Sequence, residues 1–73
     1  MELRSDVTGT VIEIVAPEGS LVRAGDVVVR IESMKMEIPL TAALSGRVTQ
    51  LRVEEGDIVK EDAVLAIIVP DAV

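Results

Sequence analysis

The stretch GTVIEIVAPEGSLVRAGDVVVRIES, residues Gly9–Ser33, decides the fold because the chain contains it twice. A shift of 37 residues lays it on Gly46–Pro70, which reads GRVTQLRVEEGDIVKEDAVLAIIVP, with seven identities in 25 positions and no gap. A chance alignment of valine-rich strands is the alternative, and the matched glycines argue against it. Self-similarity at a fixed spacing indicates two copies of one structural unit. The identical pairs are Gly9/Gly46, Val11/Val48, Glu18/Glu55, Gly19/Gly56, Val22/Val59, Val27/Val64 and Ile31/Ile68.

Each copy is expected to run strand, turn, short apolar step, turn and strand. Apolar and polar residues alternate in the first strand, the period of a half-buried strand. The first turn contains a glycine, which tolerates positive φ, and the last strand is a continuous apolar run rich in β-branched residues, which disfavour helix. In order, these segments are Thr10–Val15 and Arg47–Val53, the turns 17–20 and 54–57, the turns 24–26 and 61–63, and the strands Val27–Ile31 and Val64–Val69.

Neither copy can bury its apolar residues alone, so we expect the two to pack on each other about an approximate two-fold axis. Strands this short, separated by regular turns, are typical of a small all-β barrel or sandwich. We expect residues 1–73 to form a single domain. The segment Met34–Ser45 would link the copies, and the same shift places its counterpart at the chain termini, so the linker and the termini should lie at opposite ends of the molecule.

The composition excludes most kinds of chemistry. The chain has no Cys and no His, so we expect neither disulfides nor thiolate metal sites nor a histidine general base. It has no Phe, Trp or Tyr on which nucleobases could stack. Its net charge of −6 disfavours nucleic acid and anionic membranes as partners. No apolar run approaches the roughly 18 residues of a membrane-spanning helix, so we expect a soluble, cytoplasmic module. Because the chain offers no pair of nucleophile and base, we also expect this module to be non-catalytic.

The segment Ile31-Glu32-Ser33-Met34-Lys35-Met36-Glu37-Ile38 is nearly palindromic about the Met34–Lys35 bond. This pattern predicts a hairpin whose two-residue loop is Met34-Lys35. Such loops need positive φ at both central residues and favour Asn-Gly, so a Met-Lys loop should be strained. The register also sets Glu32 opposite Glu37, a like-charge pair that destabilises a strand ladder. Both choices indicate a turn kept for function, because strained tight turns cluster at functional sites.

Lys35 is one of two lysines in the chain and is expected at the tip of this hairpin. A plain solvated lysine over packed methionines is the simplest interpretation, and the expected exposure of Met34 and Met36 argues against it. A catalytic lysine must be desolvated or lie beside another cation to lose its proton, whereas Glu32 and Glu37 would favour the ammonium form. We therefore expect Lys35 to be presented to another protein, which modifies it.

At Glu32-Ser33-Met34-Lys35-Met36-Glu37 the sequence resembles biotinyl domains, the biotin carboxyl carrier modules of biotin-dependent carboxylases, whose hallmark is Met-Lys-Met. The resemblance implies a flattened eight-stranded barrel of two related halves, called a barrel-sandwich hybrid. Some members insert a thumb between the second and third strands, and the short run from Val15 to Leu21 leaves no room for one. The surrounding motifs that share the resemblance are Glu18-Gly19, Ala24-Gly25-Asp26-Val27, Ser45-Gly46-Arg47-Val48 and Glu55-Gly56-Asp57-Ile58-Val59.

The resemblance also implies a role for each residue of the turn. Lys35 would be the residue to which a biotin protein ligase attaches biotin covalently. The modified domain would then carry carboxybiotin from a biotin carboxylase site to a carboxyltransferase site. Met34 and Met36 would help the ligase and the carboxylase to recognise the turn, with Glu32, Ser33 and Glu37 completing the recognition segment.

Two other functions remain open at this point. A lipoyl domain of a 2-oxoacid dehydrogenase also presents a hairpin lysine, but its turn typically reads Asp-Lys-Ala, which the two methionines disfavour. An unmodified interaction module would leave the strained turn without a purpose. The sequence departs from biotinyl domains at Ser5–Gly9, usually Ala-Pro-Met-Pro-Gly, and at Asp62-Ala63, usually Gly-Asp. Neither feature indicates the acceptor, since acetyl-CoA, propionyl-CoA, pyruvate and urea are all carboxylated through such carriers.

Overall fold

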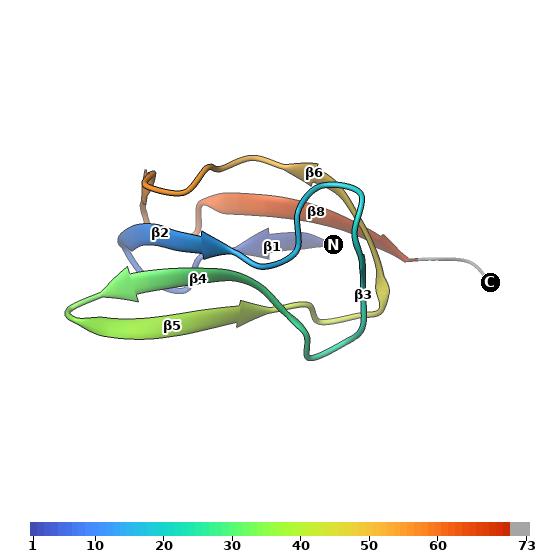
Figure 1. Ribbon diagram of the computed structural model, residues 1–73, viewed down its shortest axis with the longest axis horizontal. Coiled ribbons are helices and arrows are strands. Elements are labelled where there is room, and N and C mark those ends of the chain that lie inside the picture. The colour runs from blue at the N-terminus through green and yellow to red at the C-terminus, as the bar shows by residue number, and fades with distance from the viewer. Residues whose placement is uncertain (71–73) are drawn as a thin grey trace.

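The computed structural model describes residues 1–70, which form eight short antiparallel strands and no helix (Figure 1). The prediction of an all-β, eight-stranded structure is therefore confirmed. Six residues join the second strand to the third, too few for a thumb, as expected. The strands are β1 (Glu2–Arg4), β2 (Gly9–Ile14), β3 (Leu21–Val22), β4 (Val27–Ser33), β5 (Met36–Thr41), β6 (Gly46–Leu51), β7 (Ile58–Val59) and β8 (Val64–Pro70).

The strands form two four-stranded sheets with the same internal order. One sheet runs β1-β8-β6-β3 and the other β5-β4-β2-β7. The 37-residue shift converts the second order into the first, so each sheet draws strands from both halves of the chain. The segment Met34–Ser45 is more than the linker expected from the sequence: it contains β5, which pairs along β4 as β1 pairs along β8.

The two halves are joined by reciprocal hydrogen bonds. The Gly19 amide donates to the Val48 carbonyl at 2.7 Å, and the Gly56 amide donates to the Val11 carbonyl at 2.7 Å. The adjacent glutamates act in the same reciprocal way. The Glu18 carboxylate accepts the Leu51 amide at 3.1 Å, and the Glu55 carboxylate accepts the Ile14 amide at 3.2 Å. Each first turn is thereby bound to the first strand of the other half, which explains why both turns carry Glu-Gly.

The core between the sheets is built from equivalent aliphatic residues of the two halves. Burying one such side chain stabilises the fold by about 1.5–3 kcal/mol, so the long apolar strands β4 and β8 supply much of the stability. The buried equivalents are Leu3 and Leu40, Val11 and Val48, Val22 and Val59, Val28 and Leu65, Val29 and Ala66, and Ile31 and Ile68.

The predicted strand bounds were wrong by one or two residues. β2 and β6 begin one residue earlier than predicted and end before Val15 and Arg52. After β2 the chain bends, because the amides of Val15 and Ala16 both donate to the Val28 carbonyl and cannot continue an even ladder. β4 continues beyond Ile31 to Ser33, since the hairpin ladder extends to the loop itself. β8 ends at Pro70, one residue beyond the prediction.

The second turn of the second half also takes shape without glycine. Asp62 has φ of 71°, at the position where the first half has Gly25 with φ of 93°. The amides of both residues make the same bond, to the Ala42 carbonyl from Gly25 and to the Ser5 carbonyl from Asp62, each at 2.8 Å. Aspartate is among the few residues that tolerate this conformation, so the turn predicted at residues 61–63 forms despite the missing glycine.

The molecule is elongated, 40 Å long and 19 by 18 Å in cross-section. The β4–β5 loop lies at one end of the long axis, while Met1 and Pro70 lie toward the other end (Figure 1). This agrees with the placement predicted from the repeat. No segment of residues 1–70 is a helix that could cross a membrane.

We predict that Gly9→Ala lowers the free energy of unfolding by about 1–3 kcal/mol, because a Cβ at this position would overlap the Glu32 carbonyl oxygen and lie 2.7 Å from Cγ2 of Ile31. Urea denaturation of the purified variants measures the loss. Thr41→Ala, at the exposed last position of β5, is the control and should change stability by less than about 0.5 kcal/mol. A Gly9→Ala variant as stable as the unsubstituted chain would contradict the close approach of β2 to β4.

Candidate functional site: a lysine on a hairpin loop

The hairpin β4–β5 has the predicted register. Ser33 pairs with Met36 and Glu32 with Glu37, leaving Met34 and Lys35 as the loop. Met34 has φ of 52° and Lys35 has φ of 65°, so both loop residues adopt the left-handed conformation that a primed two-residue turn requires. For residues with a side chain this conformation costs roughly 1–2 kcal/mol each. The strain predicted from the sequence is therefore present at the loop.

The structure brings the six predicted site residues together at the tip of this hairpin. Met34 is 92% exposed and Met36 is 65% exposed, whereas Ile31, three residues before Met34, is fully buried. Lys35, Glu32 and Glu37 are exposed, and Ser33 is half-buried. The ion pairs among residues 1–70 join Arg4 to Glu2 and Arg30 to Glu13, so the Lys35 ammonium group is not held by a carboxylate.

Ser33 fastens the tip to the body of the domain. Its hydroxyl donates to the Thr8 carbonyl at 2.9 Å, and the Thr8 hydroxyl in turn accepts the Glu61 amide at 3.1 Å. In the other half, the Ser45 hydroxyl accepts the Ala24 amide in the same way. The bond from Ser33 has no such equivalent, because the repeat places Pro70, which has no hydroxyl, at the position of Ser33. Sequence reasoning missed Thr8 as a support of the site. This departure from the repeat was the available signal.

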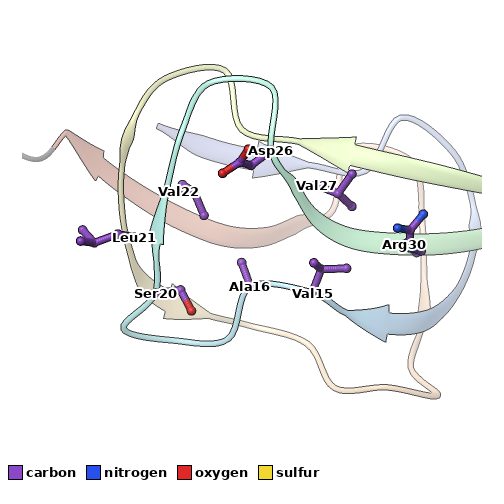
Figure 2. Close-up of a pocket in the computed structure, with 8 residues that line it drawn as sticks. All are labelled: Val15, Ala16, Ser20, Leu21, Val22, Asp26, Val27 and Arg30. Carbon is purple, nitrogen blue, oxygen red and sulfur yellow. The ribbon is translucent and has the colours of Figure 1, made fainter.

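A hollow of about 470 Å³ lies on the flank of the domain, against β3 and the beginning of β4 (Figure 2). Its charged groups already have partners, since Arg30 is bonded to Glu13 at 2.8 Å and the Asp26 carboxylate accepts the Arg23 amide at 2.9 Å. The hollow does not include the lysine loop. Within residues 1–70 no three His, Cys, Asp or Glu side chains gather as metal ligands. The hairpin tip is therefore the candidate site.

The fold and the hairpin tip define a class of small domain in which a stiff, pseudo-symmetric barrel presents a lysine away from its body. Comparison with protein families narrows this class. The model of the family described as "Biotin-requiring enzyme", the biotin/lipoyl family, matches residues 1–31 and 16–68. The chain belongs to this family.

Three relatives illustrate the match. The chain is 39% identical to the "Biotinylated protein TB7.3 homolog" of Mycobacterium leprae over 67 residues, which cover 92% of this chain and 94% of that protein. It is 47% identical to the "Biotin-dependent acyl-coenzyme A carboxylase alpha3 subunit" of the same organism, over 80% of this chain but 10% of the subunit. The crystal structure of the Kluyveromyces lactis urea carboxylase matches with a TM-score of 0.90 and 39% identity, over 94% of this chain and 6% of the carboxylase.

These matches support the predicted fold, because the urea carboxylase domain superposes on nearly the whole chain and is also 39% identical to it in sequence. The chain corresponds to almost the whole of the small biotinylated protein. It corresponds to only a small part of each carboxylase, 10% of one and 6% of the other. A domain of this fold therefore occurs both as a small protein and as one part of a large enzyme.

We predict that Met34→Asn raises the free energy of unfolding by about 0.5–1 kcal/mol, because asparagine tolerates the positive φ of this position better than methionine. Equilibrium unfolding in urea measures the gain. Met36→Asn provides the control, since Met36 is the first residue of β5 and needs no left-handed backbone, so it should bring no gain. Equal effects of the two substitutions would mean that the loop is not strained.

Proposed function

We propose that the chain is a biotin carboxyl carrier domain and that Lys35 is its site of covalent biotinylation. The observation that carries the proposal is the exposed Met34-Lys35 loop, held in a strained turn within a family whose relatives are biotinylated proteins and biotin-dependent carboxylases. The residues fit the group, because Lys35 offers a primary amine at the end of a flexible stem with no carboxylate paired to it in residues 1–70.

The modification is an acyl transfer to the Lys35 amine. The amine attacks the carbonyl carbon of biotinyl-adenylate, an amide bond forms, AMP leaves, and the ammonium protons that must be lost go to a base. The tip offers no histidine, and its only basic groups besides the amine are the carboxylates of Glu32 and Glu37, which are much weaker bases than an amine. The deprotonating group therefore belongs to the partner, a biotin protein ligase. The domain acts as the substrate of this reaction.

The geometry suits a carrier. Bound biotin supplies a ureido nitrogen that takes up and gives up a carboxyl group. The stiff hairpin fixes where the arm begins, and the lysine stem supplies the freedom to swing between two active sites. We propose that residues 1–73 work as one such domain in the cytoplasm, serving a biotin carboxylase and a carboxyltransferase that hold the catalytic groups.

The two methionines favour biotin over lipoate, because the turns of lipoyl domains typically read Asp-Lys-Ala and not Met-Lys-Met. Met34 and Met36 lie on either side of Lys35, are largely exposed, and add no side chain to the core. Exposed apolar side chains of this kind are typical of a surface that another protein covers. We propose that ligase and carboxylase contact them, together with Glu32, Ser33 and Glu37.

We predict that a biotin protein ligase, given biotin and ATP, adds one biotin to this chain and none to Lys35→Arg. Intact mass and a streptavidin blot measure the addition. Lys60→Arg is the matched control, because Lys60 is the other lysine, is exposed, and has Arg23 as its counterpart in the repeat. Biotin on Lys60, or acylation of Lys35 by a lipoate ligase with lipoate and not by the biotin ligase, would contradict the proposal.

We also predict that Met34→Ala and Met36→Ala each lower the ligase kcat/KM by about fivefold to thirtyfold, the effect of removing an apolar contact of roughly 1–2 kcal/mol. Thermal unfolding should change little, because both side chains point into solvent. Leu21, 60% exposed on β3 and paired with Arg47 in the other sheet, provides the control: Leu21→Ala should leave kcat/KM unaltered. Unchanged kinetics for both methionine variants would exclude the methionines from recognition.

A further inference from the structure

The chain confines its easily oxidised groups to three methionines. It has no Cys, His, Trp or Tyr, so a mild peroxide finds no other reactive side chain. Two of the three methionines, Met34 and Met36, lie at the hairpin tip, 92% and 65% exposed. The third, Met1, is half-buried and packs against the core. The reactive sulfur is thus concentrated on either side of Lys35.

We propose that Met34 and Met36 form a hydroperoxide-sensitive site whose oxidation weakens recognition of the Lys35 loop while leaving the fold intact. The proposal rests on the proposed function, since it takes the loop to be the surface that a ligase and a carboxylase contact. It adds a reversible control of that surface.

The chemistry is a two-electron oxygen transfer. The sulfur lone pair of the thioether attacks the distal oxygen of a hydroperoxide, the O–O bond breaks, and the sulfur becomes a sulfoxide. Hydrogen peroxide is reduced to water, or an alkyl hydroperoxide to its alcohol. Methionine sulfoxide reductases reverse the step with reducing equivalents from a dithiol. No group of this chain has to act as catalyst, so exposure of the sulfur decides the order of reaction.

The fold should tolerate the modification. Neither Met34 nor Met36 belongs to the core or to the half-buried residues packed against it. The loop conformation is set by the ladder between β4 and β5 and by the bond from Ser33 to Thr8, both of which involve no sulfur. A polar sulfoxide at the tip therefore replaces one solvent-exposed side chain by another.

Recognition should not tolerate it. A methionine contacted by a partner loses its water and packs as an apolar, adaptable side chain. A sulfoxide in the same place brings a strong acceptor oxygen that needs a hydrogen-bond donor, and burial without one is unfavourable. Because Met34 and Met36 flank Lys35 in sequence and are both exposed, we expect a partner that binds the loop to contact at least one of them.

The test treats the purified chain with a limiting amount of hydrogen peroxide and follows each methionine by peptide mass spectrometry. Met34 and Met36 should be oxidised before Met1. The oxidised chain should keep its thermal unfolding midpoint, and the ligase kcat/KM for biotin transfer should fall about tenfold, the effect expected of one unpaired polar group in a contact. Methionine sulfoxide reductases A and B should restore the rate.

The double variant Met34→Leu, Met36→Leu is the matched control, because leucine is apolar and resists peroxide. Its rate is compared with its own rate before treatment, and the two should be equal. Oxidation of Met1 as fast as the loop methionines, or transfer to the oxidised chain as fast as to the untreated one, would overturn the proposal. Failure of the untreated chain to accept biotin would instead overturn the proposed function, and the recognition half of this inference with it.

Discussion

Everything in this structure depends on the reciprocal docking of two half-domains. Each half alone has one apolar face and no second layer to cover it, so neither can bury its core residues. The bond from the Gly19 amide to Val48 and its counterpart from Gly56 to Val11 fix how the halves meet. Because the turn of one half is bound to the strand of the other, both sheets contain strands from both halves. The aliphatic core is then closed without a disulfide or an aromatic side chain, since the chain has no Cys, Phe, Trp or Tyr.

The site arises where the two-fold symmetry is broken. In one half the chain continues through a hairpin loop, and in the other the corresponding place is occupied by the termini. The loop tolerates two left-handed residues because the ladder of β4 and β5, the close approach at Gly9 and the bond from Ser33 to Thr8 together over-determine its shape. Pro39 lies on the outer strand of this hairpin and is exposed, where a proline denies a neighbouring chain one donor for strand addition. This proline thereby disfavours pairing of the β5 edge with a strand of another copy.

Much of this architecture could be predicted from the sequence. The repeat indicated two equivalent halves built from short strands, the resemblance to biotinyl domains implied eight strands, and the palindrome around Lys35 specified the hairpin register. Periodicity failed at the strand ends, because Val15 continues the apolar pattern while its amide shares the Val28 carbonyl with Ala16. It also failed to show that β1 is the counterpart of β5, since the repeat is weak outside residues 9–33 and 46–70. The support from Thr8 was missed because the acceptor of the Ser33 bond is a backbone carbonyl, which residue type does not identify. The break in the repeat, where Pro70 stands in place of Ser33, marked only the donor. The lysine was found because the strain at Met34 and Lys35 follows from the two-residue loop alone.

The central claim is that the frame presents Lys35 in a turn formed before any partner arrives. Biotin transfer by one ligase to the intact chain and to a synthetic peptide of residues 28–41 tests it most directly, because the peptide keeps every site residue and loses the other half of the domain. A preformed turn spares the ligase the cost of ordering the loop. The account predicts a kcat/KM for the intact chain at least about tenfold above that of the peptide. Equal values for the two would contradict it, because the frame would then contribute nothing to the reaction.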